Sequence, residues 1–125
     1  MAGPFEQFFR DYALAFDSSD PERVAAFFHR PLLLVGKDGA VSITEDDAIM
    51  GYTHGILEHH RANGYARAAV RDIEVTKQAP NLAIVSVHWQ VFQADEALLW
   101  DWRNTYNLLE EEGGWKILVA TTHED

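Results

Sequence analysis

The feature that most constrains this chain is a change in the spacing of its apolar residues near Asn63 and Gly64. Before this point apolar residues recur at every third or fourth position, as in amphipathic helices. After it they alternate with polar residues, as in strands that bury one face. Helices first and strands afterwards, with short turns between the strands, favour an α+β domain whose helices cover one face of a mainly antiparallel sheet. We expect a single domain over residues 1–125.

The helical half is expected to begin with two helices. Apolar residues share one stripe over Pro4–Asp17, which predicts the first helix. Asp20 is placed to cap a second helix, and Pro21 fits its first turn. We expect that helix to end at Pro31, because proline lacks the backbone N–H that a helix interior needs. Its buried residues would be Val24, Phe27 and Phe28.

A short hairpin and a third helix are expected next. Residues 32–43 hold two short apolar runs around a turn at 37–39, a pattern typical of a hairpin. Thr44 precedes acidic residues and is placed to cap the third helix, which Asn63 and Gly64 would end. The apolar stripe of this helix consists of Ile49, Tyr52, Thr53, Ile56, Leu57 and His60.

Four long strands are expected over about 66–77, 82–92, 98–109 and 115–122. On the second, the odd-numbered residues of 83–91 would face the helices. On the third, Asn104 takes an inward position among apolar residues, where an unpaired amide costs roughly 1 to 3 kcal/mol. Asn104 must therefore find a hydrogen-bond partner or line a wet cavity. On the last strand the inward set would be Trp115, Ile117 and Val119.

The charge balance narrows the classes of partner. Ten basic and twenty acidic residues give a net charge of -10, so neither nucleic acid nor a membrane surface is expected as a partner. The absence of cysteine excludes disulfides, thiol nucleophiles and thiolate metal sites. The first nine residues contain no lysine or arginine, and no long apolar run follows them. We therefore expect no signal peptide and a cytoplasmic protein.

Three stretches carry a resemblance to a known family. Residues 12–28, YALAFDSSDPERVAAFF, resemble its first two helices, AIMGY at 48–52 its third helix, and WKI at 115–117 its last strand. With this order of elements the chain resembles the NTF2-like superfamily, which includes ketosteroid isomerase and the SnoaL-like polyketide cyclases. The resemblance implies an NTF2-like cone, in which three N-terminal helices pack on a curved sheet around a pocket. It also implies dimers that pair through the outer sheet face.

The resemblance further implies roles for single residues. Tyr12 falls where ketosteroid isomerase has a tyrosine that donates a hydrogen bond to the substrate oxyanion, and Asn104 falls near its second donor, a protonated aspartic acid. The catalytic base of the isomerase, an aspartate, would lie near Val35 or Gly36, where this chain has no carboxylate. Asp38 in the predicted turn is a poor substitute, because a base must reach the proton it removes. Steroid isomerisation by that mechanism is not expected, and only its oxyanion-binding half would remain.

The candidates for chemistry are Tyr12, Asn104 and His60, with His60 as the group for proton transfer. The residues expected to line an apolar pocket are Phe16, Phe28, Tyr52, Trp89, Trp102 and Val119. A plainer interpretation stays open, in which Tyr12 and the tryptophans fill the core and His60 is a structural residue at a helix end. His54 and Glu58 at helical spacing offer two metal ligands and no third, so we expect neither metal nor cofactor.

Two functions follow from these residues. The first is binding of a small apolar or carbonyl-bearing molecule between the first helix and the sheet, with cofactor-free isomerase, cyclase or dehydratase chemistry as its enzymatic form. The second is a non-catalytic binding or dimeric assembly module whose cavity is filled by its own side chains. An empty pocket on the order of several hundred cubic ångströms would favour the first. We also expect a homodimer through the outer sheet face, at His88, Gln90, Arg103, Thr105 and Leu118.

Overall fold

The computed structural model describes residues 3–123, in which two helices, a short hairpin and a third helix are followed by four long strands. The helices are α1 (Pro4–Asp17), α2 (Pro21–Ala25) and α3 (Asp46–Ala62). The strands are β1 (Phe28–Gly36), β2 (Gly39–Ile43), β3 (Arg67–Ala79), β4 (Leu82–Phe92), β5 (Leu98–Glu111) and β6 (Gly114–His123). The α+β class and the long strands expected from the alternation are confirmed.

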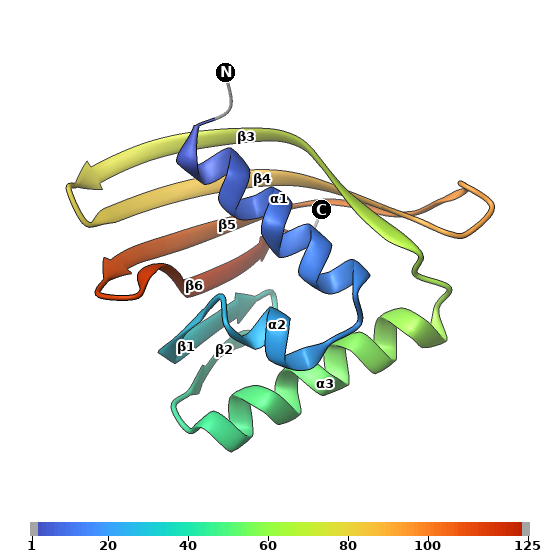
Figure 1. Ribbon diagram of the computed structural model, residues 1–125, viewed down its shortest axis with the longest axis horizontal. Helices are drawn as coiled ribbons and strands as arrows, with labels where there is room; N and C mark the ends of the chain where they lie inside the picture. Colours follow the sequence, from blue (N-terminus) through green and yellow to red (C-terminus); the bar gives the residue numbers. More distant parts are fainter. Residues whose placement is uncertain (1–2, 124–125) are drawn as a thin grey trace.

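The strands form one sheet in the order β2-β1-β6-β5-β4-β3. Neighbouring strands are antiparallel except β1 and β6, which are parallel. Strand β6 therefore joins the short hairpin to the long meander. Figure 1 shows α1 crossing the long strands, while α2 and α3 lie toward the β1–β2 end. This arrangement leaves a space between the sheet and α3 that side chains must fill or leave open.

Helix α1 packs its aromatic stripe against the sheet, and its expected bounds are confirmed. Phe9 is fully buried, with its ring centroid 4.8 Å from that of Tyr106 on β5. Phe5 packs 5.0 Å from Trp115 on β6. The odd-numbered residues of 83–91 on β4 are all buried beneath them, as expected. Burial of one aromatic ring contributes about 2 kcal/mol, so these contacts fix α1 firmly on the sheet.

The second helix is shorter than expected, which corrects the position of Phe28. Helix α2 ends at Ala25 and Phe28 opens β1, so Pro31 lies inside a strand and ends no helix. The cap is confirmed, since Asp20 Oδ1 accepts a hydrogen bond from the backbone N–H of Glu22 at 3.0 Å. Phe28 is buried as expected, but it reaches the core from the sheet.

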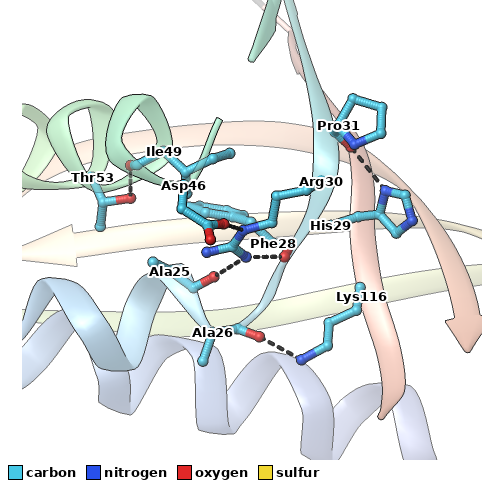
Figure 2. Close-up of polar contacts among 10 residues, drawn as sticks. All are labelled: Ala25, Ala26, Phe28, His29, Arg30, Pro31, Asp46, Ile49, Thr53 and Lys116. Atoms are coloured by element: carbon cyan, nitrogen blue, oxygen red, sulfur yellow. Dashed lines mark hydrogen bonds and ion pairs between the residues drawn. The ribbon is translucent and has the colours of Figure 1, made fainter. Parts of the chain in front are cut away.

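Arg30 explains why the chain can leave α2 early (Figure 2). Its Nη1 donates to the backbone oxygen of Ala25 at 3.1 Å and to that of Phe28 at 2.6 Å. Its Nε donates to Oδ1 of Asp46, in the first turn of α3, at 2.8 Å. Carbonyls left free at a helix end need donors from elsewhere, and Arg30 supplies one to Ala25, the last residue of α2. The same side chain thus ties α2, β1 and α3 together.

The hairpin of β1 and β2 forms as expected, with its turn at the cavity side of the molecule. Gly36 pairs with Gly39, which leaves Lys37 and Asp38 as the turn residues. Gly39 has a φ of 119°, a backbone conformation that side-chain-bearing residues rarely adopt. A glycine at this position is therefore required by the turn.

Helix α3 ends where the sequence predicts but starts one residue later than expected. Glu45, and not Thr44, is the N-cap, and it makes no side-chain hydrogen bond to the helix. The helix stops at Ala62, and Gly64 follows with a φ of 89°. Neither α3 nor any other helix within residues 3–123 has the length and apolar content needed to cross a membrane.

A β-bulge in β6 overturns the expectation for Val119. The register with β5 shifts between Ile117 and Val119, so Leu118 is an extra residue in the pairing. An extra residue reverses the alternation of faces beyond it. Ile117 is buried, and past the bulge Ala120 packs against the core. The prediction that Val119 faces inward and lines a pocket is therefore wrong.

Candidate ligand cavity

A cavity of about 1030 Å³ lies between the sheet, α1, α3 and the β1–β2 hairpin. Its wall on α3 includes Gly51 and Gly55, which lie four residues apart. A Cβ atom added at either glycine would meet no atom within 4 Å. On the sheet side, Ala68 and Ala120 contribute only methyl groups to the cavity wall. The space stays open because small residues occupy positions where larger side chains would fill it.

All four tyrosines of the chain line this cavity: Tyr12, Tyr52, Tyr65 and Tyr106. Burial raises the pKa of each phenol, in the case of Tyr52 to about 12. Burial acts this way because a low-dielectric environment disfavours the phenolate. At neutral pH the cavity therefore holds neutral phenols, each with one proton to donate.

Tyr65 uses its proton within the protein. Its hydroxyl donates to Oδ1 of Asp17 at 2.7 Å, and the same oxygen accepts from the backbone N–H of Ala68 at 3.0 Å. Burial, the hydrogen bond to Asp17 and the charge of that carboxylate all raise the pKa of Tyr65. These bonds join the end of α1 to the start of β3. Tyr65 and Asp17 thus serve the structure of the cavity wall and leave no free group there.

Tyr106 sits at the centre of a hydrogen-bond chain on the sheet. The indole Nε1 of Trp102 donates to Asn104 Oδ1 at 3.0 Å, and Asn104 Nδ2 donates to the Tyr106 hydroxyl at 3.0 Å. Trp89 Nε1 donates to the same hydroxyl at 2.9 Å. An indole N–H only donates, so the carbonyl side of the Asn104 amide must face Trp102. Asn104 is therefore largely committed to protein partners.

The hydroxyls of Tyr12 and Tyr52 make no hydrogen bond within residues 3–123. Tyr12 is 6% exposed, with Phe16 and Phe27 rings 4.9 and 5.3 Å from its own. In the same part of the chain, Nδ1 of His60 is the one fully buried side-chain nitrogen or oxygen atom that has no hydrogen-bond partner. The two tyrosine oxygens are therefore not sealed off, and their protons are available to a molecule in the cavity.

His60 also lines the cavity and is neutral at physiological pH. Burial first, and the charge of His59 second, lower its pKa to about 4. Its ring stacks on Tyr65 at 5.0 Å and lies 5.5 Å from Phe16 and 5.3 Å from Trp100. A group with so low a pKa holds a proton weakly. The geometry suits a neutral polar contact better than proton transfer.

The structure brings the predicted site residues to one cavity, with a single exception. The lining includes Tyr12, Phe16, Phe28, Tyr52, His60, Trp89, Trp102 and Asn104, from helices and strands far apart in the sequence. Val119 is the exception, because the bulge at Leu118 turns it away from the cavity. The sequence does not single out Tyr106, because an inward-facing tyrosine among apolar residues of a strand looks like one more core residue. The available signal was its position two residues after Asn104, on the same face of β5.

Charged groups at the cavity are few. Lys37 and Asp38 of the hairpin turn line it, and Asp38 is the only carboxylate to do so among residues 3–123. Away from the cavity, His54 Nε2 lies 3.9 Å from Glu58 Oε1, with both side chains exposed. The described part of the chain holds no group of three His, Asp or Glu residues placed to bind a metal ion.

The outer face of β4 and β5 carries a different set of polar groups. Asp101 Oδ1 lies 2.6 Å from His88 Nε2, and Asp101 Oδ2 accepts from Gln90 Nε2 at 2.9 Å. The hydrogen bonds from Gln90 and His88 lower the pKa of Asp101. Arg103 donates to Asp72 Oδ2 at 3.1 Å. These pairs are at least partly exposed, and each charged group has a partner of its own.

Solved structures similar in shape are distant in sequence. A domain of unknown function with a cystatin-like fold from Nostoc punctiforme has a TM-score of 0.75 and 17% identity, over 97% of this chain and 75% of that one. An NTF2-like protein with a cystatin-like fold from Novosphingobium aromaticivorans has a TM-score of 0.74 and 15% identity, over 94% and 77%. An NTF2-like protein of unknown function from Shewanella oneidensis has a TM-score of 0.75 and 10% identity, over 96% of both chains. Together they confirm the cystatin-like, NTF2-like fold.

The family described as NTF2-like protein (DUF6841) matches residues 3–125. This chain therefore belongs to that family, and the NTF2-like resemblance of its sequence is confirmed. The finer SnoaL-like or ketosteroid-isomerase-like type stays a prediction. No curated protein is significantly similar to the chain in sequence.

Proposed function

We propose that this protein binds a small, largely apolar molecule that presents an acceptor oxygen, such as a carbonyl or phenolate oxygen. The observation that carries the proposal is an open cavity of about 1030 Å³ with aromatic walls and phenol hydroxyls that lack protein partners. An apolar cavity with a few convergent polar groups is the common form of a small-molecule site. A cavity of this volume does not support the alternative of an assembly module filled by its own side chains.

The polar groups of the cavity favour acceptor oxygens over donor groups. Tyr12, Tyr52 and Tyr106 are neutral phenols that supply protons. The carboxylate of Asp38 lies in the hairpin turn, and His60 is neutral. A carbonyl oxygen would receive hydrogen bonds from these phenols, whereas an ammonium group beside them would lose its hydration, since the one carboxylate of the lining within residues 3–123, Asp38, belongs to the hairpin turn.

Catalysis on a carbonyl compound is the second candidate function. Phenol donors stabilise negative charge that develops on an oxygen, which would serve a cofactor-free isomerase, cyclase or dehydratase. Proton transfer also needs a base, and the positions near Val35 and Gly36 offer no carboxylate. His60, whose pKa is about 4, is a weak base. Binding is therefore the function that the cavity supports best.

Titration with α-tetralone, a flat bicyclic ketone, tests the proposed binding. Trp89, Trp100 and Trp102 line the cavity, so a bound ketone should quench tryptophan fluorescence with a saturable curve. A ligand of about eleven non-hydrogen atoms is expected to bind with a Kd on the order of 0.1 to 1 mM. Free N-acetyltryptophanamide measures collisional quenching as a control. A linear response identical to that control would contradict the proposed function.

We also propose that two copies pair through the outer sheet face, as the family resemblance implies. The residues proposed for the contact are His88, Gln90, Arg103 and Thr105, with Leu118 in the bulge of β6, while the cavity lies on the other side of β4 and β5. Light scattering at micromolar concentration tests this proposal. A monomeric mass would reject the dimer, and a dimer unaffected by Arg103→Glu would reject this surface.

A further inference from the structure

We infer that the Tyr106 hydroxyl selects the ligand's polar atom, because it can act only as a donor toward the cavity. The atom that meets it must then be an acceptor, such as a carbonyl oxygen, and an amine or ammonium group is excluded from that position. This inference rests on the proposed function, since it names the chemistry of a ligand in the same cavity. Nothing in the family match assigns a role to Tyr106.

The first step concerns the lone pairs of the hydroxyl oxygen. A phenol has one proton and two lone pairs. Trp89 Nε1 occupies one lone pair at 2.9 Å, and it has no ability to accept. Asn104 Nδ2 occupies the other at 3.0 Å, in an orientation fixed by Trp102 on the carbonyl side of that amide. Both lone pairs are filled by groups that only donate.

The second step concerns the remaining proton. No acceptor for the Tyr106 O–H is found within residues 3–123. Tyr106 is 3% exposed yet forms part of the cavity wall, so its proton is directed to whatever the cavity holds. Buried donors are rarely left unpaired in proteins. A ligand oxygen or an ordered water must complete the network.

The third step distinguishes Tyr106 from the other cavity phenols. Tyr12 and Tyr52 keep free lone pairs, so each can either donate to a ligand or accept from it. Hydrogen bonds accepted by a hydroxyl polarise its O–H and strengthen it as a donor. Burial raises the pKa of Tyr106, and the bonds from Asn104 and Trp89 oppose that rise, in agreement with their polarising effect. Asn104 is a positioning residue in this arrangement, since it acts through Tyr106.

Three probes with one bicyclic skeleton test the inference: α-tetralone, tetralin and the ammonium form of aminotetralin. Binding is measured by calorimetry, and the carbonyl stretch of bound α-tetralone by infrared difference spectroscopy. We expect α-tetralone to bind about tenfold tighter than tetralin, which corresponds to one hydrogen bond, and aminotetralin not to bind. The carbonyl band should lie lower in frequency than that of the ketone in an apolar solvent.

Variants separate the roles of the two residues. Tyr106→Phe should remove the preference for α-tetralone over tetralin and return the carbonyl band toward its apolar-solvent position. Asn104→Leu should move the band in the same direction by a smaller amount, because Tyr106 keeps its proton but loses one polarising partner. Thr76→Val is the control and should leave both readouts unchanged, because Thr76 is an exposed residue of β3 that neither lines the cavity nor belongs to the proposed dimer residues.

The outcomes separate this inference from the proposed function. Equal affinities for α-tetralone and tetralin, or tight binding of aminotetralin, would overturn the role of Tyr106 and leave a binding cavity. A carbonyl band unaffected by Tyr106→Phe would do the same. If that variant does not fold, a wild-type band at the apolar-solvent position overturns the inference by itself. Failure of all three probes to bind would overturn both proposals.

Discussion

The two faces of the β4–β5 pair are built from alternate residues of the same strands, yet they use their polar groups differently. On the outer face His88, Asp101 and Arg103 pair with one another or with neighbours, and each charge has a partner. On the inner face Trp89 and Asn104 donate to Tyr106, whose proton has no acceptor among residues 3–123. The outer network is complete, and the inner one lacks a final acceptor.

The difference shows where to look for function in this fold. Exposed ion pairs are inexpensive to form and contribute little to stability, so a complete outer network needs no functional explanation. A polar chain inside an apolar cavity is costly unless every donor is satisfied. The incomplete network is therefore the place where we propose that a ligand binds.

Filling the cavity should have the largest effect. Gly55→Leu places a side chain where an added Cβ meets no atom within 4 Å, so binding of α-tetralone should be lost. The same change replaces glycine inside a helix by a good helix former, which should raise the free energy of unfolding by about 1 kcal/mol. Calorimetric titration and urea unfolding measure the two effects. A variant that still binds the ketone with wild-type affinity would place the ligand elsewhere.

Removal of a tyrosine hydroxyl that is hydrogen-bonded to the protein should lower the free energy of unfolding more than removal of one without a protein partner. Tyr65→Phe deletes the donor to Asp17 and should lower the free energy of unfolding by about 1.5 to 3 kcal/mol, as for bonds to charged groups. Tyr52→Phe removes the same atom from the same cavity, but without a protein partner, and should change stability by less than about 0.5 kcal/mol. Urea unfolding compares them. Equal losses would mean that Tyr52 has a partner in the protein.

The buried His60 should make the protein sensitive to mild acid. Its pKa falls from 6.5 in the unfolded chain to about 4 in the folded protein, so between these values the unfolded chain binds more protons. The free energy of unfolding is therefore unaffected by His60 above pH 6.5 and falls as the pH drops toward 4. The expected loss is about 1 to 2 kcal/mol, after discounting for the partial exposure of the ring. His60→Phe should flatten this part of the stability curve. Parallel curves for the two proteins would contradict the burial of a neutral imidazole.

The outer face should respond only in stronger acid and only slightly. The pKa of Asp101 lies below 3.8, so its contribution is present above that pH and is lost as the pH falls below it. Asp101→Asn should therefore reduce the slope of stability against pH below 3.8 and leave affinity for α-tetralone unchanged. A weakened affinity would show that the two faces are coupled.

Sequence patterns predicted most of the fold because the helical and strand periods are clear. The stripe of α1 fixed its bounds at Pro4–Asp17, and the alternation on β4 identified its buried face. The errors arose where a tertiary contact competes with a local signal. Arg30 draws the chain out of α2 early, and the bulge at Leu118 turns Val119 outward. Neither event has a marker in the spacing of apolar residues.

The sequence predicted most of the residues that line the cavity, but it did not predict the hydrogen bonds between them. Tyr12 and Asn104 do line one cavity, but Asn104 Oδ1 accepts a hydrogen bond from Trp102 and Asn104 Nδ2 donates one to Tyr106. An inward tyrosine on a strand looks like a core residue until its hydroxyl's partners are known. The role of Tyr106 depends on an indole that lies on the neighbouring strand, Trp89, and sequence spacing does not reveal that pairing.

The central claim is that a ligand oxygen completes the hydrogen-bond network of Tyr106. A crystal structure of the protein with α-tetralone tests it most directly. We expect the ketone in the cavity, with its oxygen about 2.7 Å from the Tyr106 hydroxyl and the bonds from Trp89 and Asn104 intact. A ketone bound on the outer face, or one inside the cavity whose oxygen points away from Tyr106, would contradict the claim.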